Sequence, residues 1–273
     1  MSGGSGLTAL LLAGNRPGVD PLAAAFGVAV KALVPIAGET MLSRVARTLV
    51  DHPAIGRVIV LAQDPSVLTD HTDTRWLESH PAIFFEPAGV SVSAAIHDAL
   101  ERHGGGYPFL VTTADHPLLD TATIDAFLSP AQASGADVAV GLVERRVMRV
   151  AFPDNQRTWL RFRGGAYSGA NLFLLSGTKA LAALRLWRTI EQQRKKGRAV
   201  IGAFGPVILL GVALRLLSLD GALARAGRRL GLTAKAIPLP IAEACIDVDK
   251  PADHVLATAI LERRARDIAT IRS

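Results

Sequence analysis

Short apolar runs alternate along the chain with segments of helical periodicity. Over 40–50, Met41, Leu42, Val45 and Leu49 recur at the spacing of one helix face. The apolar runs end at turn residues, which is typical of buried strands. They predict strands at Leu7–Ala13, Arg57–Ala62, Ala82–Phe85, Phe109–Thr113, Ala136–Val143, Leu172–Leu175 and Ala244–Val248.

Helices predicted between these strands complete the pattern, and a basic hairpin-like stretch is expected over 144–163. Strands that alternate with helices through short turns indicate a parallel sheet with right-handed crossovers. We therefore predict an α/β fold, Rossmann-like, with three α/β/α layers, a mostly parallel twisted sheet and a helical insertion before the last strand. Residues 1–6 are Gly/Ser-rich and predict a disordered tail. Residues 7–273 are expected to form a single domain, with the insertion at about 179–235.

The composition of the chain indicates that it binds an anionic partner. Hydrophobic residues make up 49% of the 273 residues and aromatic residues only 5%, so the core is built mainly from Ala, Val, Leu and Ile. Lys and Arg number 30 against 24 Asp and Glu, and the pI is about 10.0. This excess suits a nucleotide, a phosphorylated substrate or an acidic membrane surface. No helix-turn-helix, zinc-binding or RNP-type pattern is present, and we expect no nucleic acid partner.

Cys245 is the only cysteine, which excludes an intramolecular disulfide and favours the cytoplasm. Leu7–Ala13 is too short for a signal-peptide core and is predicted as the first strand. The basic run at 194–198 precedes sixteen uncharged residues, 199–214, fewer than the ~20 that span a bilayer. Residues 194–215 therefore predict either a buried helix or lid, or a peripheral contact with the inner membrane face.

The first strand opens into a loop with the chemistry of a phosphate site. Gly14 allows a close backbone approach, and Arg16 on the same loop can contact phosphate. Lys31 precedes an apolar segment, an unusual place for a charge unless it points into a polar site. The alternative is an ordinary strand-to-helix turn with exposed Arg and Lys side chains.

Two acidic motifs each follow a predicted strand. Asp115 lies in Ala114-Asp115-His116-Pro117, and Asp247 and Asp249 lie in a second cluster that ends at Asp253. Ligands of open α/β sheets bind at the carboxyl ends of strands, and Mg²⁺ prefers one or two carboxylates with phosphate oxygens. Helix capping is the alternative, and we assign it to Asp253.

These motifs resemble the MobA-like (molybdenum cofactor guanylyltransferase-like) NTP transferase family, in the superfamily of nucleotide-diphospho-sugar transferases. The matching residues are L-A-G at 12–14, K-A-L-x-P-x-x-G-x-x-M-L from Lys31, A-D-H-P around Asp115 and D-V-D-x-P-x-D from Asp247. The glycine-rich loop itself departs from the G-G-x-S-x-R-M-G pattern of the family.

The resemblance implies a role for each matching residue. Arg16, Lys31, Asp115 and Asp249 would be catalytic, and Mg²⁺ would be held by Asp115 and Asp249, with Asp247 in reserve. The nucleotide would contact Leu12, Ala13, Gly14, Asn15, Arg16, Lys31, Gly89, Ser93 and Asp115. Ser168, Gly169 and Asn171 would contact the acceptor. For the loop that carries Gly89 and Ser93, the alternative is helix capping by Ser91 or Ser93. For Gly169, the alternative is a β-bulge or a turn.

The predicted activity is transfer of NMP from an NTP, CTP or GTP, to a small phosphorylated acceptor, with release of pyrophosphate. One alternative is a glycosyltransferase that uses a nucleotide sugar. That class usually has a D-x-D motif in the middle of its sequence, whereas Asp115 is followed by His116 and Pro117. A second alternative is a catalytically inactive nucleotide-binding or membrane-associated partner protein. The sequence does not predict the acceptor or the oligomeric state.

Overall fold

The computed structural model describes residues 6–15, 18–89, 91–155, 157–192, 211 and 214–272. The chain forms two compact units. The first unit comprises Met1–Val90, Thr112–Thr121 and Ile246–Ser273, and the second comprises Ser91–Val111 and Ala122–Cys245. Segments that are distant in sequence therefore share a unit, and the first unit contains both acidic motifs.

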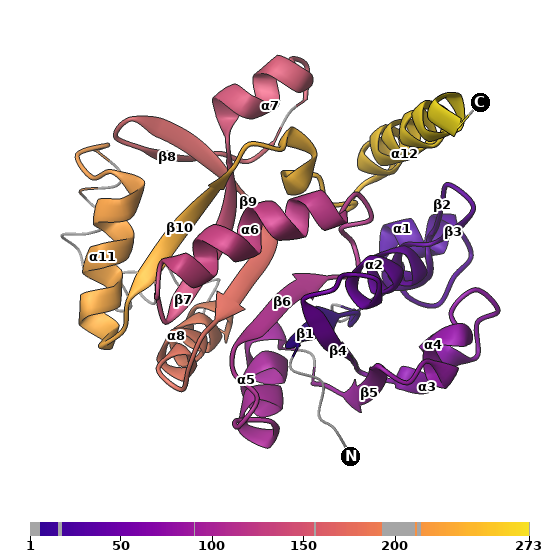
Figure 1. Ribbon diagram of the computed structural model, residues 1–273, viewed down its shortest axis with the longest axis horizontal. Helices are drawn as coiled ribbons and strands as arrows, with labels where there is room; N and C mark the ends of the chain where they lie inside the picture. The colour runs from indigo at the N-terminus through magenta and orange to yellow at the C-terminus, as the bar shows by residue number, and fades with distance from the viewer. Residues whose placement is uncertain are drawn as a thin grey trace. The chain divides into compact units, whose positions relative to one another are not determined.

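Three parallel strands form the centre of the first unit: β1 (Leu7–Leu12), β4 (Ile55–Ala62) and β5 (Ile83–Pro87) (Figure 1). β4 lies in the middle, since its residues pair with both neighbours. Leu10 of β1 pairs with Ile59, and Val60 pairs with Phe85 of β5. Leu10, Ile59 and Val60 are fully buried, which explains why these strands are continuous apolar runs in the sequence.

Helix α2 (Met41–Val50) shows how the sequence starts an element in this unit. It begins after Thr40, whose hydroxyl accepts a hydrogen bond from the Ser43 backbone N–H, and its predicted apolar face is fully buried. The remaining elements of the unit are α1 (Pro21–Ala25), the 3₁₀ helix η1 (Lys31–Leu33), β2 (Pro35–Ile36), β3 (Glu39–Thr40), α3 (Pro65–Thr69), α4 (Trp76–Ser79) and α12 (Pro251–Arg272).

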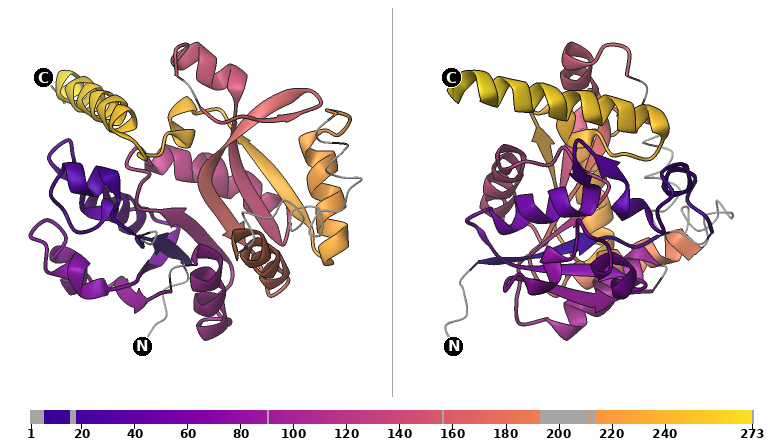
Figure 2. Two further views of the ribbon diagram at one scale, coloured as in Figure 1. Left: turned by 180° about the vertical axis from the view of Figure 1, so that it is seen from behind. Right: turned by 90° about the vertical axis from the view of Figure 1, so that its right-hand side faces the viewer.

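In the second unit, the long strand β9 (Gly165–Leu175) runs antiparallel to its neighbours. β9 pairs antiparallel with β6 (Phe109–Thr113), β7 (Val138–Glu144) and β8 (Leu160–Phe162), while β10 (Ala234–Leu239) pairs parallel with β7. Its helices are α5 (Val92–Arg102), α6 (Thr121–Ala133), α7 (Arg145–Ala151), α8 (Ala180–Gln192) and α11 (Leu219–Leu230). α5 packs against α8, and α11 packs against β10 (Figure 2).

Both units combine parallel strands with helices, so the predicted Rossmann-like α/β class is confirmed. The strands predicted near residues 7, 57, 82, 109, 136 and 172 all form, and Cys245 is buried as expected. The single domain over 7–273 and its insertion stay predictions. α8 and α11 are the helices described within the proposed insertion.

The strand predicted at Ala244–Val248 is wrong. Ala242–Cys245 is a 3₁₀ helix, in which the Ala244 N–H donates to the Ile241 carbonyl at 3.2 Å. The apolar run is buried as a core turn, a case that hydrophobicity alone does not separate from a strand. The last strand is instead β10, whose Lys235 and Pro238 hide it in the sequence. Among the described strands β10 pairs only with β7, and proline is tolerated on such an edge strand.

The basic stretch 144–163 is only partly a hairpin. Three residues near its end form β8, which pairs with β9, but its first half is mostly the helix α7. Met148 anchors this short helix in the core while its arginines remain accessible.

In the described part of the chain, no helix is long and apolar enough to cross a membrane. The predicted membrane contact at 194–215 lies outside the described residues, except at 211, 214 and 215. It stays a prediction.

Candidate functional site

Backbone hydrogen bonds bring three loops of the first unit together. The Ala114 N–H, just after β6, donates to the Leu12 carbonyl at the end of β1, at 2.9 Å. The Asp115 carbonyl in turn accepts from the Val248 N–H at 2.8 Å. These bonds fix the loop after β1 and the two acidic motifs at the carboxyl ends of the strands, where parallel sheets bind ligands.

Lys31 bridges the two acidic motifs. Its Nζ donates to Asp115 Oδ2 at 2.6 Å and to Asp249 Oδ1 at 2.5 Å. The side chains of Lys31 and Asp115 are 18% and 19% exposed, and that of Asp249 is 45% exposed. Three residues predicted from separate motifs therefore form one cluster, the Lys31 cluster, that is open to solvent on the side of Asp249.

The two carboxylates keep Lys31 charged despite its burial. Burial alone would lower the pKa of the ammonium, but the charges and hydrogen bonds of Asp115 and Asp249 raise it above its ordinary value. The cluster thus carries two negative charges around one positive charge, which favours the entry of further cations.

Local backbone structure places Lys31. The residue opens η1, in which Ala32 and Leu33 are buried, and its N–H donates to Asn15 Oδ1 at 3.2 Å. The segment then turns back between β2 and β3 at Ala37 and Gly38, both with positive φ. A two-residue hairpin of this kind needs left-handed residues, which explains the glycine of the motif.

The sequence analysis missed Gln63, which holds the loop after β1. Its Oε1 accepts from the Asn15 N–H at 2.7 Å, and its Nε2 donates to the Gly89 carbonyl at 3.3 Å. A Cβ on Gly14 would lie only 2.7 Å from this Nε2, so glycine is needed for the close approach. Gln63 directly follows β4, and its position at the carboxyl end of a central strand was the available signal.

The cluster fits a divalent metal ion. Asp115 Oδ1 is buried and has no hydrogen-bond partner among the residues that the structure describes, although Oδ2 binds Lys31. Two carboxylates already converge on one cation, and carboxylate oxygens are preferred ligands of Mg²⁺. The contacts with Lys31 come from Asp115 and Asp249, while Asp247 stays the reserve ligand.

Asp253 does not occupy the N-cap position that the sequence predicted. It lies within the first turn of α12, and its Oδ2 accepts from the backbone N–H groups of Asp249 and Lys250 at 3.2 and 3.0 Å. This is the reverse half of a capping box, in which a residue inside the helix binds the preceding backbone. It fixes the main chain of Asp249.

Ser93, a predicted nucleotide contact, lies in the second unit at the start of α5. Ser91 is the N-cap, as its hydroxyl accepts from the Ala94 N–H at 3.2 Å. The carboxylate of Glu191, which the sequence analysis missed, accepts from the hydroxyls of Ser91 and Ser93 at 2.9 and 2.7 Å and from the Val92 N–H at 3.2 Å. An anionic group therefore already lies at this helix N-terminus.

The predicted acceptor contacts lie at an irregularity of β9. Between the pairs Val140–Phe173 and Leu142–Gly169, β7 has one residue while β9 has three. Asn171 lies within this bulge with a φ of 50°, in the left-handed region. Such bulges redirect side chains and are common beside binding sites. The bulge weighed for Gly169 is present, and the acceptor roles of Ser168, Gly169 and Asn171 stay predictions.

Arg16 lies outside the described residues, so its predicted contact with phosphate stays a prediction. Leu12 is the last residue of β1, and Ala13 follows it, with its N–H donating to the Leu61 carbonyl at 2.9 Å. The nucleotide contacts predicted for these residues and for Gly89 also stay predictions.

Solved structures of similar fold include transferases. One from Thermus thermophilus, described as a hypothetical transferase, superposes with a TM-score of 0.74 and 29% identity, covering 91% of this chain and 99% of that one. A 4-diphosphocytidyl-2C-methyl-D-erythritol synthase has a TM-score of 0.57 and 14% identity, over 94% of this chain and 98% of that one. A CMP:2-keto-3-deoxy-manno-octonic acid synthetase complexed with CTP has a TM-score of 0.57 and 13% identity, over 94% and 99%. The last two share the fold alone.

No curated protein sequence matches the chain. A family model does, over residues 9–206, which include the loop after β1, Lys31 and Asp115. This range covers most of the chain and agrees with the resemblance carried by the sequence motifs. The chain belongs to the family of the MobA-like NTP transferase domain.

Proposed function

We propose that the protein transfers the nucleotidyl group of an NTP to a small phosphorylated acceptor, with Mg²⁺ as cofactor. In this reaction an acceptor phosphate oxygen attacks the α-phosphorus of the NTP and forms a new P–O bond. The bond between the α- and β-phosphates breaks, and pyrophosphate leaves. The acceptor phosphate is already a nucleophile at neutral pH, so no general base is needed.

The Lys31 cluster is the observation that carries the proposal. Two carboxylates from separate acidic motifs converge on one cation, at 2.6 and 2.5 Å, within a family of NTP transferases. Two anionic reactants repel each other as they approach, and a site for this reaction must neutralise charge and align the groups. A metal ion held by Asp115 and Asp249 would supply part of that neutralisation.

Residues around the cluster have distinct tasks in the proposal. Lys31 exchanges its carboxylate partners for the triphosphate when the substrate binds, and Arg16 adds a second positive charge. Gln63 holds the Asn15 N–H and the Gly89 carbonyl in fixed positions, which preorganises the loop that faces the nucleotide. Gly14 provides the close approach of that loop.

The acceptor side of the proposal rests on Ser168, Gly169 and Asn171. The left-handed conformation of Asn171 costs of order 1 kcal/mol or more, and such strain is typical of binding sites. For the base we propose CTP or GTP. Two proteins of the same fold bear names of cytidylyl chemistry, which places CTP first among the nucleotides to test.

Pyrophosphate release tests the proposal. Each of CTP, GTP, ATP and UTP is incubated with Mg²⁺ and a panel of phosphorylated polyols and sugars, and turnover with at least one pair is expected. Asp115→Asn should reduce this turnover by at least about 100-fold, because the cation site loses a charged ligand. Asp73→Asn, at an exposed carboxylate of the same unit, is the matched control and should retain activity. Equal activity of the two variants would refute the metal assignment.

A further inference from the structure

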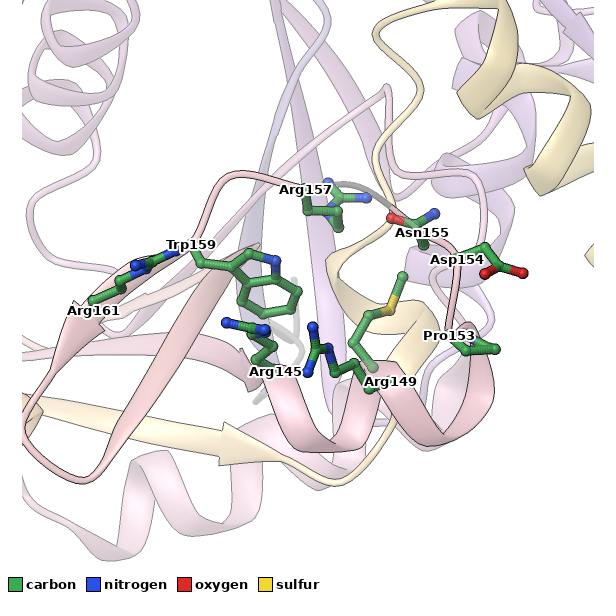
Figure 3. A pocket seen from close by; sticks show the side chains of 9 residues that line it. Arg145, Arg149, Pro153, Asp154, Asn155, Arg157, Trp159 and Arg161 are labelled. Carbon is green, nitrogen blue, oxygen red and sulfur yellow. The ribbon is translucent and has the colours of Figure 1, made fainter.

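A concave pocket of about 510 Å³ opens in the second unit, beside α7 (Figure 3). Among the described residues, its wall includes four arginines and one tryptophan but only one acidic residue. The charged and aromatic members are Arg145, Arg149, Asp154, Arg157, Trp159 and Arg161. We call this the arginine pocket. None of the three residues of the Lys31 cluster lines it.

The arginine pocket holds more positive charge than the surrounding protein balances. Among the described residues, Arg145, Arg149 and Arg161 have neither an ion pair nor a hydrogen bond from their side chains. Arg146, the neighbour of Arg145, differs: its Nε lies 2.7 Å from Glu144 Oε2, and it does not line the pocket. Like charges around one cavity repel each other, and a bound anion would remove this repulsion.

The side chains converge from two elements. Arg145 and Arg149 are one turn apart on α7 and point toward the indole of Trp159 (Figure 3). Met148, which is 1% exposed, anchors the same helix in the core. Arg161 extends from β8 and is held by the pairing of that strand with β9, in which it lies opposite Ala166. The positive groups are therefore mounted on regular elements.

Asn155 adds a hydrogen-bond acceptor to a wall whose arginines are all donors. Its Oδ1 is buried and has no hydrogen-bond partner in the described part of the chain, and the residue lines the pocket. A buried acceptor without a donor is costly unless a ligand supplies one. Guanidinium groups bind phosphate oxygens in forked pairs, whereas an amide oxygen accepts from a hydroxyl. The wall thus matches a ligand that carries both phosphate and hydroxyl groups.

We propose that the arginine pocket binds a small phosphate-bearing polyol. Its volume falls in the range of small-molecule sites, about 300–1,000 Å³. A concave wall with unpaired guanidinium groups on one side and a single buried acceptor suits a compact ligand better than an extended polymer or a flat bilayer. The ligand is either a separate phosphorylated effector or the phosphorylated acceptor itself. The second case rests on the proposed function, and the pocket would then replace Ser168, Gly169 and Asn171 as the acceptor site.

Binding at Trp159 tests this proposal without any need for turnover. The chain contains three tryptophans, Trp76, Trp159 and Trp187. Protein labelled with 5-fluorotryptophan therefore gives three ¹⁹F signals, and the Trp159→Phe variant identifies the one from the pocket. Inorganic phosphate and glycerol 3-phosphate are titrated separately, without divalent metal and at constant ionic strength.

The Trp159 signal should shift saturably with glycerol 3-phosphate and more weakly with phosphate. Arg149→Ala and Arg161→Ala should each weaken the midpoint about tenfold, the expected loss for one charge-assisted contact. Both residues are exposed, so their removal leaves the core intact. The control Arg146→Ala should leave the midpoint within about twofold, because Arg146 does not line the pocket and is paired with Glu144.

Two results would overturn the proposal. In the first, the Trp159 signal does not move with either probe. In the second, Arg146→Ala weakens binding as much as Arg149→Ala, which would mean diffuse attraction by the basic surface.

Kinetics then identify the source of the phosphate. A higher KM for the acceptor alone in Arg149→Ala assigns the pocket to the acceptor. Unchanged KM values together with lost binding assign it to an effector.

Discussion

Among single residues, Lys31 is the one whose side chain joins the two acidic motifs. Its ammonium binds the same two carboxylates that would hold a metal ion, at 2.6 and 2.5 Å. Under the proposed mechanism, a metal ion and the lysine would compete for Asp115 and Asp249 when no nucleotide is present. The same mechanism requires both cations once a triphosphate is bound, because the substrate brings several negative charges.

Replacing Lys31 should consequently have opposite effects on metal binding and on turnover. Without nucleotide, Lys31→Met should bind Mn²⁺ about tenfold more tightly than the wild type, since a positive charge near the ion is removed. Turnover with the NTP should fall about 100-fold. Mn²⁺ titration followed by EPR measures the first effect. Lys235→Met, at an exposed ion pair with Asp220, is the control, and equal Mn²⁺ affinity in all three proteins would rule out the competition.

Gly14 and Gln63 should act on nucleotide affinity as a single unit. A Cβ at Gly14 would meet the Gln63 amide, and this amide holds the Asn15 N–H at 2.7 Å. Gly14→Ala and Gln63→Ala should each weaken NTP binding about tenfold, near the value of one hydrogen bond. The double variant should be no weaker than either single variant. Calorimetric titration checks this, with Gly105→Ala as a control at an open position. Additive losses would contradict a shared role.

At the level of elements, the sequence predicts best those segments whose local pattern agrees with their burial. β1, β4 and β6 are buried apolar runs, and the polar loops that follow β1 and β6 carry predicted site residues. Lys31 and the two aspartates could be found because each belongs to a distinct motif. Their contact could not, because it depends on backbone bonds between loops that are far apart in sequence.

The errors have equally physical causes. β10 contains a lysine and a proline, so its sequence pattern resembles that of a loop. It can form a strand because it lies at the edge of the sheet, where proline is tolerated. Gln63 carries no charge and no motif, and Glu191 reaches α5 across 98 positions of sequence. Long-range hydrogen bonds of this kind leave no local signal.

Helix α5 offers a prediction on stability. Burial alone would raise the pKa of Glu191, but hydrogen bonds from Ser93, Ser91 and the Val92 N–H lower it below its ordinary value of 4.5. A carboxylate whose pKa is lowered by folding stabilises the protein fully above the unfolded value, and this stabilisation is lost as the pH falls through the folded value.

Glu191→Gln should therefore lower the free energy of unfolding at pH 7 by up to about 1 kcal/mol, as for an anion at a helix N-terminus. The difference from the wild type should shrink as the pH falls below 4.5. Urea unfolding at several pH values measures it. Glu101→Gln, at the other end of α5 and 59% exposed, should cause a smaller change. A difference that stays constant with pH would contradict the role of the charge.

Considered as a whole, the molecule joins a family fold to an uneven distribution of charge. The net charge is +6. The Lys31 cluster combines one lysine with two carboxylates, and the arginine pocket is lined by four arginines. The family establishes the class of domain, while the base and the acceptor depend on residues that family membership does not fix. The fate of each phosphate distinguishes nucleotidyl transfer from the other reactions such a fold supports.

Phosphate tracing tests nucleotidyl transfer most directly. The protein is incubated with Mg²⁺, a phosphorylated acceptor and NTP labelled with ³²P at either the α- or the γ-position. Nucleotidyl transfer predicts that the α-label enters the acceptor product, that the γ-label leaves in pyrophosphate, and that Asp115→Asn abolishes both. Label from the γ-position in the acceptor, or no transfer of label with any of the four nucleotides, would contradict it.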